Sequence, residues 1–144
     1  MLVKFAVIAG SASKDLGKRI ARRLKAPYVE AKTRVFPDGE SKITFGRIPK
    51  NSVVLVVQST YPPGDTNLLQ TQSIISQARK ASSKIYAIIP YMGYARQDKQ
   101  FLSGEVVTMS IVARMLQAAG AKKIVVVDIP VSYTHLTLPT TPYV

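Results

Sequence analysis

Cysteine is absent from this 144-residue sequence, and so are long apolar runs. Without cysteine the chain forms neither disulfides nor thiolate metal sites. No apolar run approaches the roughly 20 residues that a membrane-spanning helix needs, so we expect no membrane partner. The first apolar run, residues 2–9, is interrupted by Lys4 and is followed by a basic helical pattern, unlike a secretory signal. We therefore expect a cytoplasmic protein.

Acidic residues are scarce: 8 Asp and Glu stand against 20 Lys and Arg, which gives a net charge of +12. Such a surplus invites a nucleic-acid interpretation. The positive charges are spread along the chain, however, and are dense only on one predicted helix within residues 14–25. Neither zinc-ligand spacing nor an aromatic RNA-binding motif accompanies them. A basic surface also steers an anionic small molecule, so a nucleic-acid-binding module is the least favoured of our alternatives and we expect no nucleic-acid partner.

The length fits one domain with its own core. Apolar runs typical of buried strands alternate with segments of helical periodicity, and this alternation predicts an α/β fold with three layers, a parallel sheet with helices on both faces. We expect a hairpin or flap over residues 33–48, with Ser13 and Gly120 as helix caps. The predicted strands cover residues 3–9, 53–57, 85–89 and 124–128, and the predicted helices run from Ser13 to Leu24, from Leu68 to Lys80 and from Glu105 to Ala119.

The last part of the sequence differs from the rest. Residues 131–144 contain no Asp, Glu, Lys or Arg, include the single histidine of the chain, His135, and show neither helical periodicity nor strand alternation. Residues 132–140 resemble translated adapter sequence. We therefore expect a truncated domain over residues 1–130, followed by a non-native or disordered tail over residues 131–144.

Three loops follow predicted strands, at residues 10–13, 59–67 and 91–101. Open parallel sheets bind ligands just beyond the carboxyl ends of their strands. The segment from Pro90 to Lys99 combines aromatic rings, a glycine, an arginine and a carboxylate. Arginine is a planar cation that can stack on a base and donate bidentate hydrogen bonds to phosphate oxygens. The alternative is a solvated loop whose tyrosines close the top of the core.

Four segments, taken in this order and at this spacing, closely resemble the N-terminal half of the ribose-phosphate diphosphokinase family, which makes phosphoribosyl diphosphate. They are the FPDGE turn at 36–40, QSTYPP at 58–63, PYMGYARQDK at 90–99 and VVVD at 125–128. The resemblance covers about residues 3–129. It implies a phosphoribosyltransferase-like (Rossmann-like) domain from a transferase of nucleotide biosynthesis.

The resemblance also implies an ATP site shared between subunits of a homo-oligomer, which in the family is built from dimers into a hexamer. Phe36 would stack on the adenine bound to a neighbouring subunit, and Arg96 would cover the other face of the base, since a base favours planar partners on both faces. Taken alone, Phe36 is equally well a buried hairpin residue and Asp38-Gly39 an ordinary turn. The implied nucleotide-binding residues are Phe36, Asp38, Gly39, Glu40, Arg96 and Gln97.

The implied reaction transfers the diphosphoryl group of ATP to ribose 5-phosphate with the help of Mg²⁺ and releases AMP. The metal motif of the family has a histidine two residues after its aspartate, whereas this chain reads Asp128-Ile129-Pro130. Asp128 is thus the expected metal ligand without its histidine, and His135 does not replace it because Pro130 fixes the intervening backbone.

The ribose 5-phosphate loop and the flexible catalytic loop of the family belong to a second domain, which this sequence does not contain. We therefore expect no catalytic residue in this fragment and no activity from the fragment alone. The alternative within the same family is a non-catalytic regulatory subunit that keeps the fold and the assembly surface.

Overall fold

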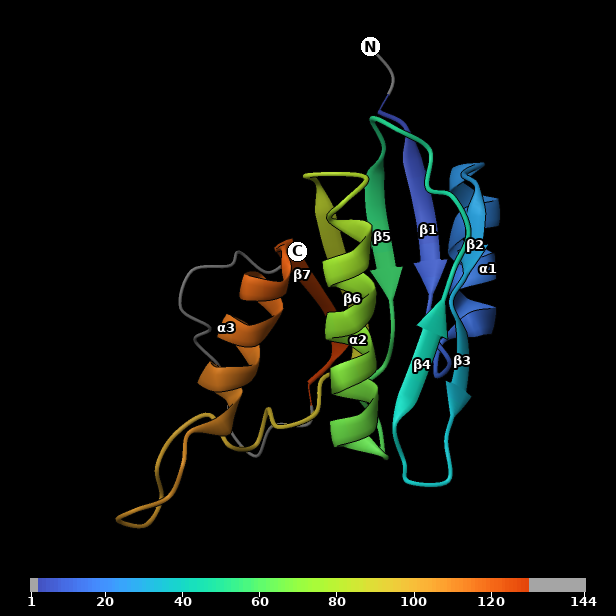
Figure 1. Ribbon diagram of the computed structural model, residues 1–144. Helices are drawn as coiled ribbons and strands as arrows, with labels where there is room; N and C mark the ends of the chain where they lie inside the picture. Colours follow the sequence, from blue (N-terminus) through green and yellow to red (C-terminus); the bar gives the residue numbers. More distant parts are fainter. Residues whose placement is uncertain (1–2, 130–144) are drawn as a thin grey trace.

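A computed structural model describes residues 3–129 of the chain. Its main element is a sheet of five strands, all paired in parallel, and the central strand β5 is buried along its whole length. Parallel strands covered on both faces are typically continuous apolar runs, which is the pattern of residues 53–57. In spatial order the strands are β2 (Tyr28–Glu30), β1 (Phe5–Ala9), β5 (Val53–Val57), β6 (Ile85–Tyr91) and β7 (Ala121–Asp128) (Figure 1).

Helices lie on both faces of the sheet (Figure 1). Helix α1 (Lys14–Leu24) packs on one face, where its Ala21 joins a small cluster of buried strand residues. Helices α2 (Gly64–Ala78) and α3 (Thr108–Ala119) pack on the other face around a larger cluster that includes Ile75 and Leu116. The predicted α/β fold with three layers is therefore confirmed.

A separate antiparallel hairpin, formed by β3 (Lys32–Val35) and β4 (Ser41–Thr44), stands beside the sheet next to α2 (Figure 1). Ile43 and Phe45 pack against the larger core cluster. The turn between the two strands lies at the far end of the hairpin, so the predicted flap over residues 33–48 is confirmed with shorter strands.

Two helix starts differ from the prediction. Helix α2 begins at Gly64 rather than Leu68, because Pro63 takes the N-cap position and the Asn67 side chain donates to the Tyr61 carbonyl at 2.7 Å. Helix α3 begins at Thr108 rather than Glu105. The Glu105 carboxylate instead closes a loop by accepting from the amides of Phe101 and Leu102 at 2.9 and 3.0 Å.

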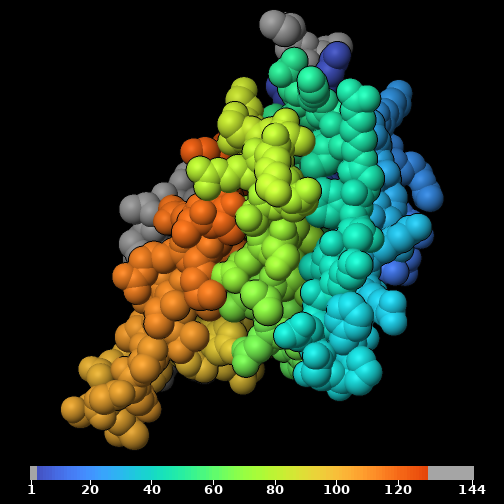
Figure 2. Space-filling view, in the orientation of Figure 1, coloured from blue at the N-terminus to red at the C-terminus, as the bar shows by residue number. Residues whose placement is uncertain are grey.

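The later start of α3 leaves Val106, predicted on its buried face, 63% exposed. The loop at 101–105 belongs to the segment that projects from the body of the molecule (Figure 2).

Of the predicted caps, Gly120 closes α3 with a positive φ of 128°. Ser13 takes the N-cap position of α1, but its hydroxyl accepts from the Ser59 amide at 2.9 Å instead of from its own helix. No helix within residues 3–129 is both long and apolar enough to cross a membrane.

Candidate functional site

The loops beyond the carboxyl ends of the strands are held together by backbone hydrogen bonds. The Gln58 amide donates to the Ile88 carbonyl at 3.0 Å, and the Thr60 amide donates to the Tyr91 carbonyl at 3.0 Å. The Met92 amide donates to the carbonyl of Asp128, the last residue of β7, at 3.2 Å. The segments after β5 and β6 and the last residue of β7 are therefore joined side by side at this edge of the sheet.

A buried amide network joins this edge to the hairpin. The Gln58 side chain, 0% exposed, accepts from the Ala12 amide at 2.9 Å and donates to Gln70 Oε1 at 3.4 Å. Gln70 Oε1 also accepts from Ser11 Oγ at 2.7 Å, and Gln70 Nε2 donates to Ser41 Oγ at 3.0 Å. Since Ser41 opens β4, the network fixes the base of the flap to the sheet and to α2.

Sequence reasoning missed this network. Its one local signal is Gln58 directly after five apolar strand residues, because a buried amide at such a place must find partners. Gly10 supplies the space, because a Cβ at this position would collide with Gln58 Oε1. The partners of Gln58 come from distant segments, and the sequence does not identify them.

The predicted nucleotide-binding turn, residues 36–40, is a tight turn at the end of the hairpin. The Phe36 amide donates to the Glu40 carbonyl at 2.8 Å, and the Glu40 amide donates to Asp38 Oδ1 at 3.1 Å. Gly39 has φ = 90°, which glycine adopts without strain. Phe36 is half-buried with the Arg34 guanidinium 5.2 Å from its ring centroid, whereas Asp38, Gly39 and Glu40 are exposed. The turn thus presents one aromatic ring and two carboxylates to solvent.

The second predicted segment, after β6, is anchored in the core. Met92 and Ala95 are 1% and 0% exposed, while the neighbouring Arg96 and Gln97 are exposed. The Gln97 carbonyl accepts from the Met109 amide at 3.1 Å, which ties the segment to the first turn of α3. The arginine and the glutamine are therefore displayed from a fixed backbone.

Close packing against the neighbouring loop adds to this anchoring. The Gly93 amide donates to Thr60 Oγ1 at 2.7 Å, and a Cβ on Gly93 would lie 3.0 Å from the Thr60 carbonyl oxygen. The rings of Tyr61 and Tyr91 meet edge to face with their centroids 5.2 Å apart. Tyr94 adopts a positive φ of 64°, so this segment turns sharply just before Arg96.

The hairpin turn and the segment after β6 lie at the same end of the molecule, on opposite sides of the start of α2 (Figure 1). Within one chain they stand apart. The six predicted nucleotide-binding residues thus fall into two groups, Phe36 to Glu40 on the turn and Arg96 with Gln97 on the anchored segment.

Asp128, the predicted metal ligand, ends β7 and pairs with Tyr91 of β6. Its side chain is exposed, and within residues 3–129 it forms no ion pair. The described residues contain no group of three Asp, Glu or His side chains that could hold a metal ion. A single exposed carboxylate fits Mg²⁺, which is commonly bound by one or two carboxylates together with water and substrate phosphates. Pro130, His135 and the predicted boundary at 130/131 lie outside the described residues.

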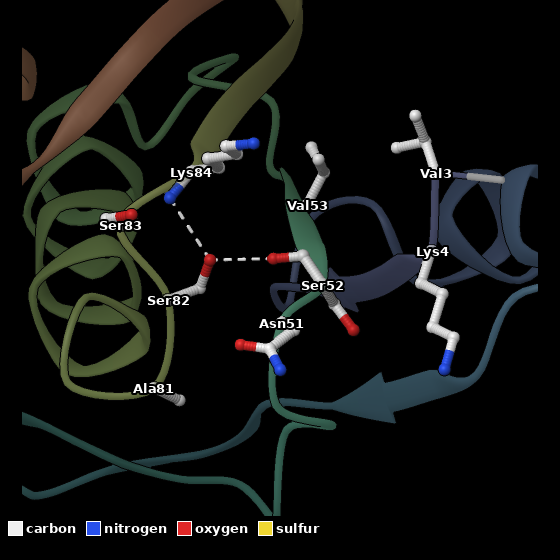
Figure 3. Close-up of a pocket in the computed structure, with 9 residues that line it drawn as sticks. All are labelled: Val3, Lys4, Asn51, Ser52, Val53, Ala81, Ser82, Ser83 and Lys84. Atoms are coloured by element: carbon white, nitrogen blue, oxygen red, sulfur yellow. Dashed lines mark hydrogen bonds between the residues drawn. The ribbon is translucent and has the colours of Figure 1, made fainter. Parts of the chain in front are cut away.

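Cavity size does not identify the site. A cavity of about 730 Å³ lies at the opposite end of the sheet, at the amino ends of β1 and β5 (Figure 3). At the predicted edge, a cavity of about 580 Å³ borders the start of α1 and includes Ser59 and Pro90. The larger cavity is lined by Val3, Lys4, Asn51, Ser52, Val53, Ala81, Ser82, Ser83 and Lys84.

One ion pair borders the smaller cavity. Lys14 Nζ lies 2.9 Å from Glu30 Oε1 and joins α1 to β2. The hydrogen bond between the two side chains is the main cause that raises the pKa of Lys14 and lowers the pKa of Glu30. Both side chains are well exposed, so the pair is screened by solvent.

Comparison with known proteins gives one consistent family. Residues 5–120 match the family model described as the N-terminal domain of ribose phosphate pyrophosphokinase. The ribose-phosphate pyrophosphokinase of Methanobrevibacter smithii is 40% identical over 125 residues, which cover 85% of this chain and 41% of the relative. That of Methanothermobacter thermautotrophicus is 41% identical over 124 residues, which cover 85% of this chain and 43% of the relative.

A solved structure agrees with these relatives. The crystal structure of phosphoribosylpyrophosphate synthetase from Mycobacterium smegmatis superimposes with a TM-score of 0.80 at 31% identity, over 88% of this chain and 43% of that one. The chain thus spans less than half the length of the relatives it matches. Since the family model covers most of the described residues, the chain belongs to the ribose-phosphate pyrophosphokinase family and matches its N-terminal domain.

Proposed function

We propose that this chain is the nucleotide-binding half of an enzyme that transfers the diphosphoryl group of ATP to ribose 5-phosphate, giving phosphoribosyl diphosphate and AMP. Membership of the family supports the reaction class. The observation that carries the binding role is that Phe36 to Glu40 and Arg96 to Gln97 sit on two separate, well-anchored elements at the same end of the sheet.

In this proposal two chains complete one site. The Phe36 ring of one chain covers one face of adenine, and the Arg96 guanidinium of a second chain covers the other. Asp38 and Glu40 accept hydrogen bonds from the base or the ribose, and Gln97 holds the nucleotide beside Arg96. The separation of the two elements within one chain supports this division, because a flat base needs partners on both of its faces.

Asp128 would hold Mg²⁺ together with the nucleotide phosphates, and the ion would neutralise charge on the transferred group. The residues of this chain orient the nucleotide so that its β-phosphorus faces the attacking anomeric hydroxyl. Alignment and charge neutralisation supply most of the rate in reactions of this kind. The ordered backbone around Met92 and Gly93 keeps Arg96 in place, so that binding does not have to order it.

We further propose that the 144-residue chain alone does not catalyse the reaction, since the resemblance assigns ribose 5-phosphate to a second domain. A regulatory subunit of the same family remains the alternative. It predicts that the chain co-purifies with an active homologue, and a pull-down distinguishes the two proposals.

The nucleotide role is tested by isothermal titration of the chain with ATP and Mg²⁺. Phe36→Ala and Arg96→Ala should each weaken binding about tenfold or more, since stacking of a base on one side chain contributes about 1–3 kcal/mol. Arg114→Ala is the matched control, an exposed arginine on α3. Unchanged affinity in both site variants would overturn the proposal. Release of AMP from ATP and ribose 5-phosphate by the chain alone would overturn the proposed inactivity.

A further inference from the structure

A buried glutamine holds the hairpin next to the predicted nucleotide-binding turn. Ser41 directly follows the turn at 36–40 and pairs with Val35, the residue that precedes the turn. The Gln70 side chain, on α2 and 3% exposed, donates from Nε2 to Ser41 Oγ at 3.0 Å. Helix α2 therefore contacts the hairpin where the turn departs from the two strands.

The direction of this hydrogen bond is fixed from the other end of the buried amide network. The Ala12 amide donates to Gln58 Oε1 at 2.9 Å, so the Gln58 Nε2 group faces Gln70 as a donor. Gln70 must then present its oxygen to Gln58, which leaves its own Nε2 group for Ser41. Ser11 Oγ adds a second hydrogen bond to Gln70 Oε1 at 2.7 Å. One backbone amide thus sets the orientation of both side-chain amides.

The apolar anchors of the hairpin lie farther from the turn. Ile43 and Phe45 pack against the larger core cluster. Before β3 begins, the Ala31 amide donates to the Ala9 carbonyl at 3.1 Å. These contacts hold the part of the hairpin away from the turn. The hydrogen bond to Ser41 opposes a sideways displacement beside the turn itself, where the other contacts oppose it least.

We infer that Gln70 is a positioning residue for the nucleotide site, an inference that rests on the proposed function. The Phe36 amide and the Glu40 carbonyl close the turn at 2.8 Å, and in the proposed site this turn meets the base held by Arg96 of a second chain. Gln70 does not touch the nucleotide in this arrangement. It keeps the turn at one place beside α2, so that binding does not have to order the turn.

The test is isothermal titration with ATP and Mg²⁺ at one chain concentration. Ser41→Ala and Gln70→Met remove the hydrogen bond from opposite sides, and each should weaken binding about three- to tenfold, because the turn is then no longer held in place. Ser82→Ala is the matched control. The Ser82 hydroxyl donates to the Ser52 carbonyl at 2.7 Å at the opposite end of the sheet (Figure 3), so this variant should bind ATP as the parent chain does.

Two further variants separate positioning from a general loss of stability. In a chain that carries Phe36→Ala, Gln70→Met should weaken binding less than it does in the parent chain, because the ring that Gln70 positions is absent. Gln70→Glu keeps the shape of the side chain and an acceptor toward Gln58. Its second oxygen can accept from the Ser41 hydroxyl, so this variant should bind ATP within about twofold of the parent chain.

Unchanged affinity in Ser41→Ala and Gln70→Met, together with weaker binding in Phe36→Ala, would overturn the inference and leave the proposed function standing. A loss from Gln70→Met that is equal with and without Phe36, or equal to that of Gln70→Glu, would also overturn it, since Gln70 would then act by another route. Unchanged affinity in both Phe36→Ala and Arg96→Ala would overturn the proposed function and the inference together.

Discussion

The hairpin turn and the segment after β6 both carry predicted nucleotide-binding residues, but they differ in how they are attached to the core. The turn at 36–40 is held by its own short hydrogen bonds and by the base of the hairpin, where Ser41 meets Gln70. The segment after β6 is anchored by buried Met92 and Ala95 and by bonds to Thr60 and to the start of α3. One is an arm that reaches away from the core, and the other is a platform on the core. In the proposed site, the arm of one chain would reach the platform of a second chain.

The largest expected effect comes from weakening the platform. Met92→Ala removes a side chain that is 1% exposed and should destabilise the fold by about 2–4 kcal/mol. Phe36→Ala removes a half-buried ring on the arm and should destabilise the fold by about 1 kcal/mol or less. Urea unfolding of both variants measures the difference. Equal destabilisation by the two substitutions would show that the arm is part of the core and would contradict the distinction between the arm and the platform.

The second expected effect concerns the buried amide network that links the hairpin to the sheet. Gln58→Met keeps the length of the side chain but leaves the Ala12 amide and Gln70 without this partner, which should cost about 1–3 kcal/mol. Gln77→Met is the matched control on the exposed face of α2 and should change stability by less than about 0.5 kcal/mol. Stability of Gln58→Met equal to that of the control would show that the buried amides do not hold the hairpin to the sheet.

The shape of the arm depends on Gly39. Gly39→Ala places a Cβ at φ = 90° and should destabilise the fold by about 1 kcal/mol, although nothing lies within 4 Å of that Cβ. Gly46→Ala, which also has open space but no positive φ, is the control and should be neutral or slightly stabilising. Thermal unfolding compares the two. If both variants unfold at the same temperature, glycine at position 39 does not relieve backbone strain at the turn.

The smallest effect is expected at the exposed Lys14 and Glu30 pair, which joins α1 to β2. The folded pKa of Glu30 lies below its ordinary value of 4.5, so the contribution of the pair is present above that pH and is lost as the pH falls through the folded pKa. The pKa of Lys14 is raised above 10.5, so the contribution is lost again as the pH rises through that higher pKa.

Glu30→Gln should therefore lower the urea midpoint slightly at pH 7, and this difference should disappear as the pH falls through the folded pKa of Glu30. High salt should reduce the difference at pH 7, because the pair is exposed. A difference that does not shrink as the pH is lowered below 4.5 would mean that Glu30 contributes through packing rather than through its charge.

The sequence predicted the central elements because their signals are local. Five consecutive apolar residues at 53–57 are consistent with a strand buried on both faces, which the structure confirms, and the helical stripe of Met109, Ala113 and Leu116 is buried as expected. Gly120 closes α3 because its positive φ favours glycine. The hairpin at 33–48 was also predicted, from alternation around a turn that contains Asp38-Gly39.

Features that depend on which partner a polar side chain binds were not predicted. Glu105 resembles the start of a helix, but its carboxylate binds the amides of Phe101 and Leu102, so Val106 is left in solvent. Ser13 is a good capping residue whose hydroxyl is used by Ser59 instead. In both cases a specific polar side-chain contact outweighs helix propensity. The roles given to Phe36, Arg96 and Asp128 came from family resemblance and stay predictions.

The most direct test of the shared nucleotide site is a titration of the 144-residue chain with ATP and Mg²⁺ while light scattering follows its assembly. If two chains supply the two faces of the site, the monomer binds ATP weakly and the affinity rises as chains associate. Tight ATP binding by a chain that remains a monomer throughout the titration would contradict the account.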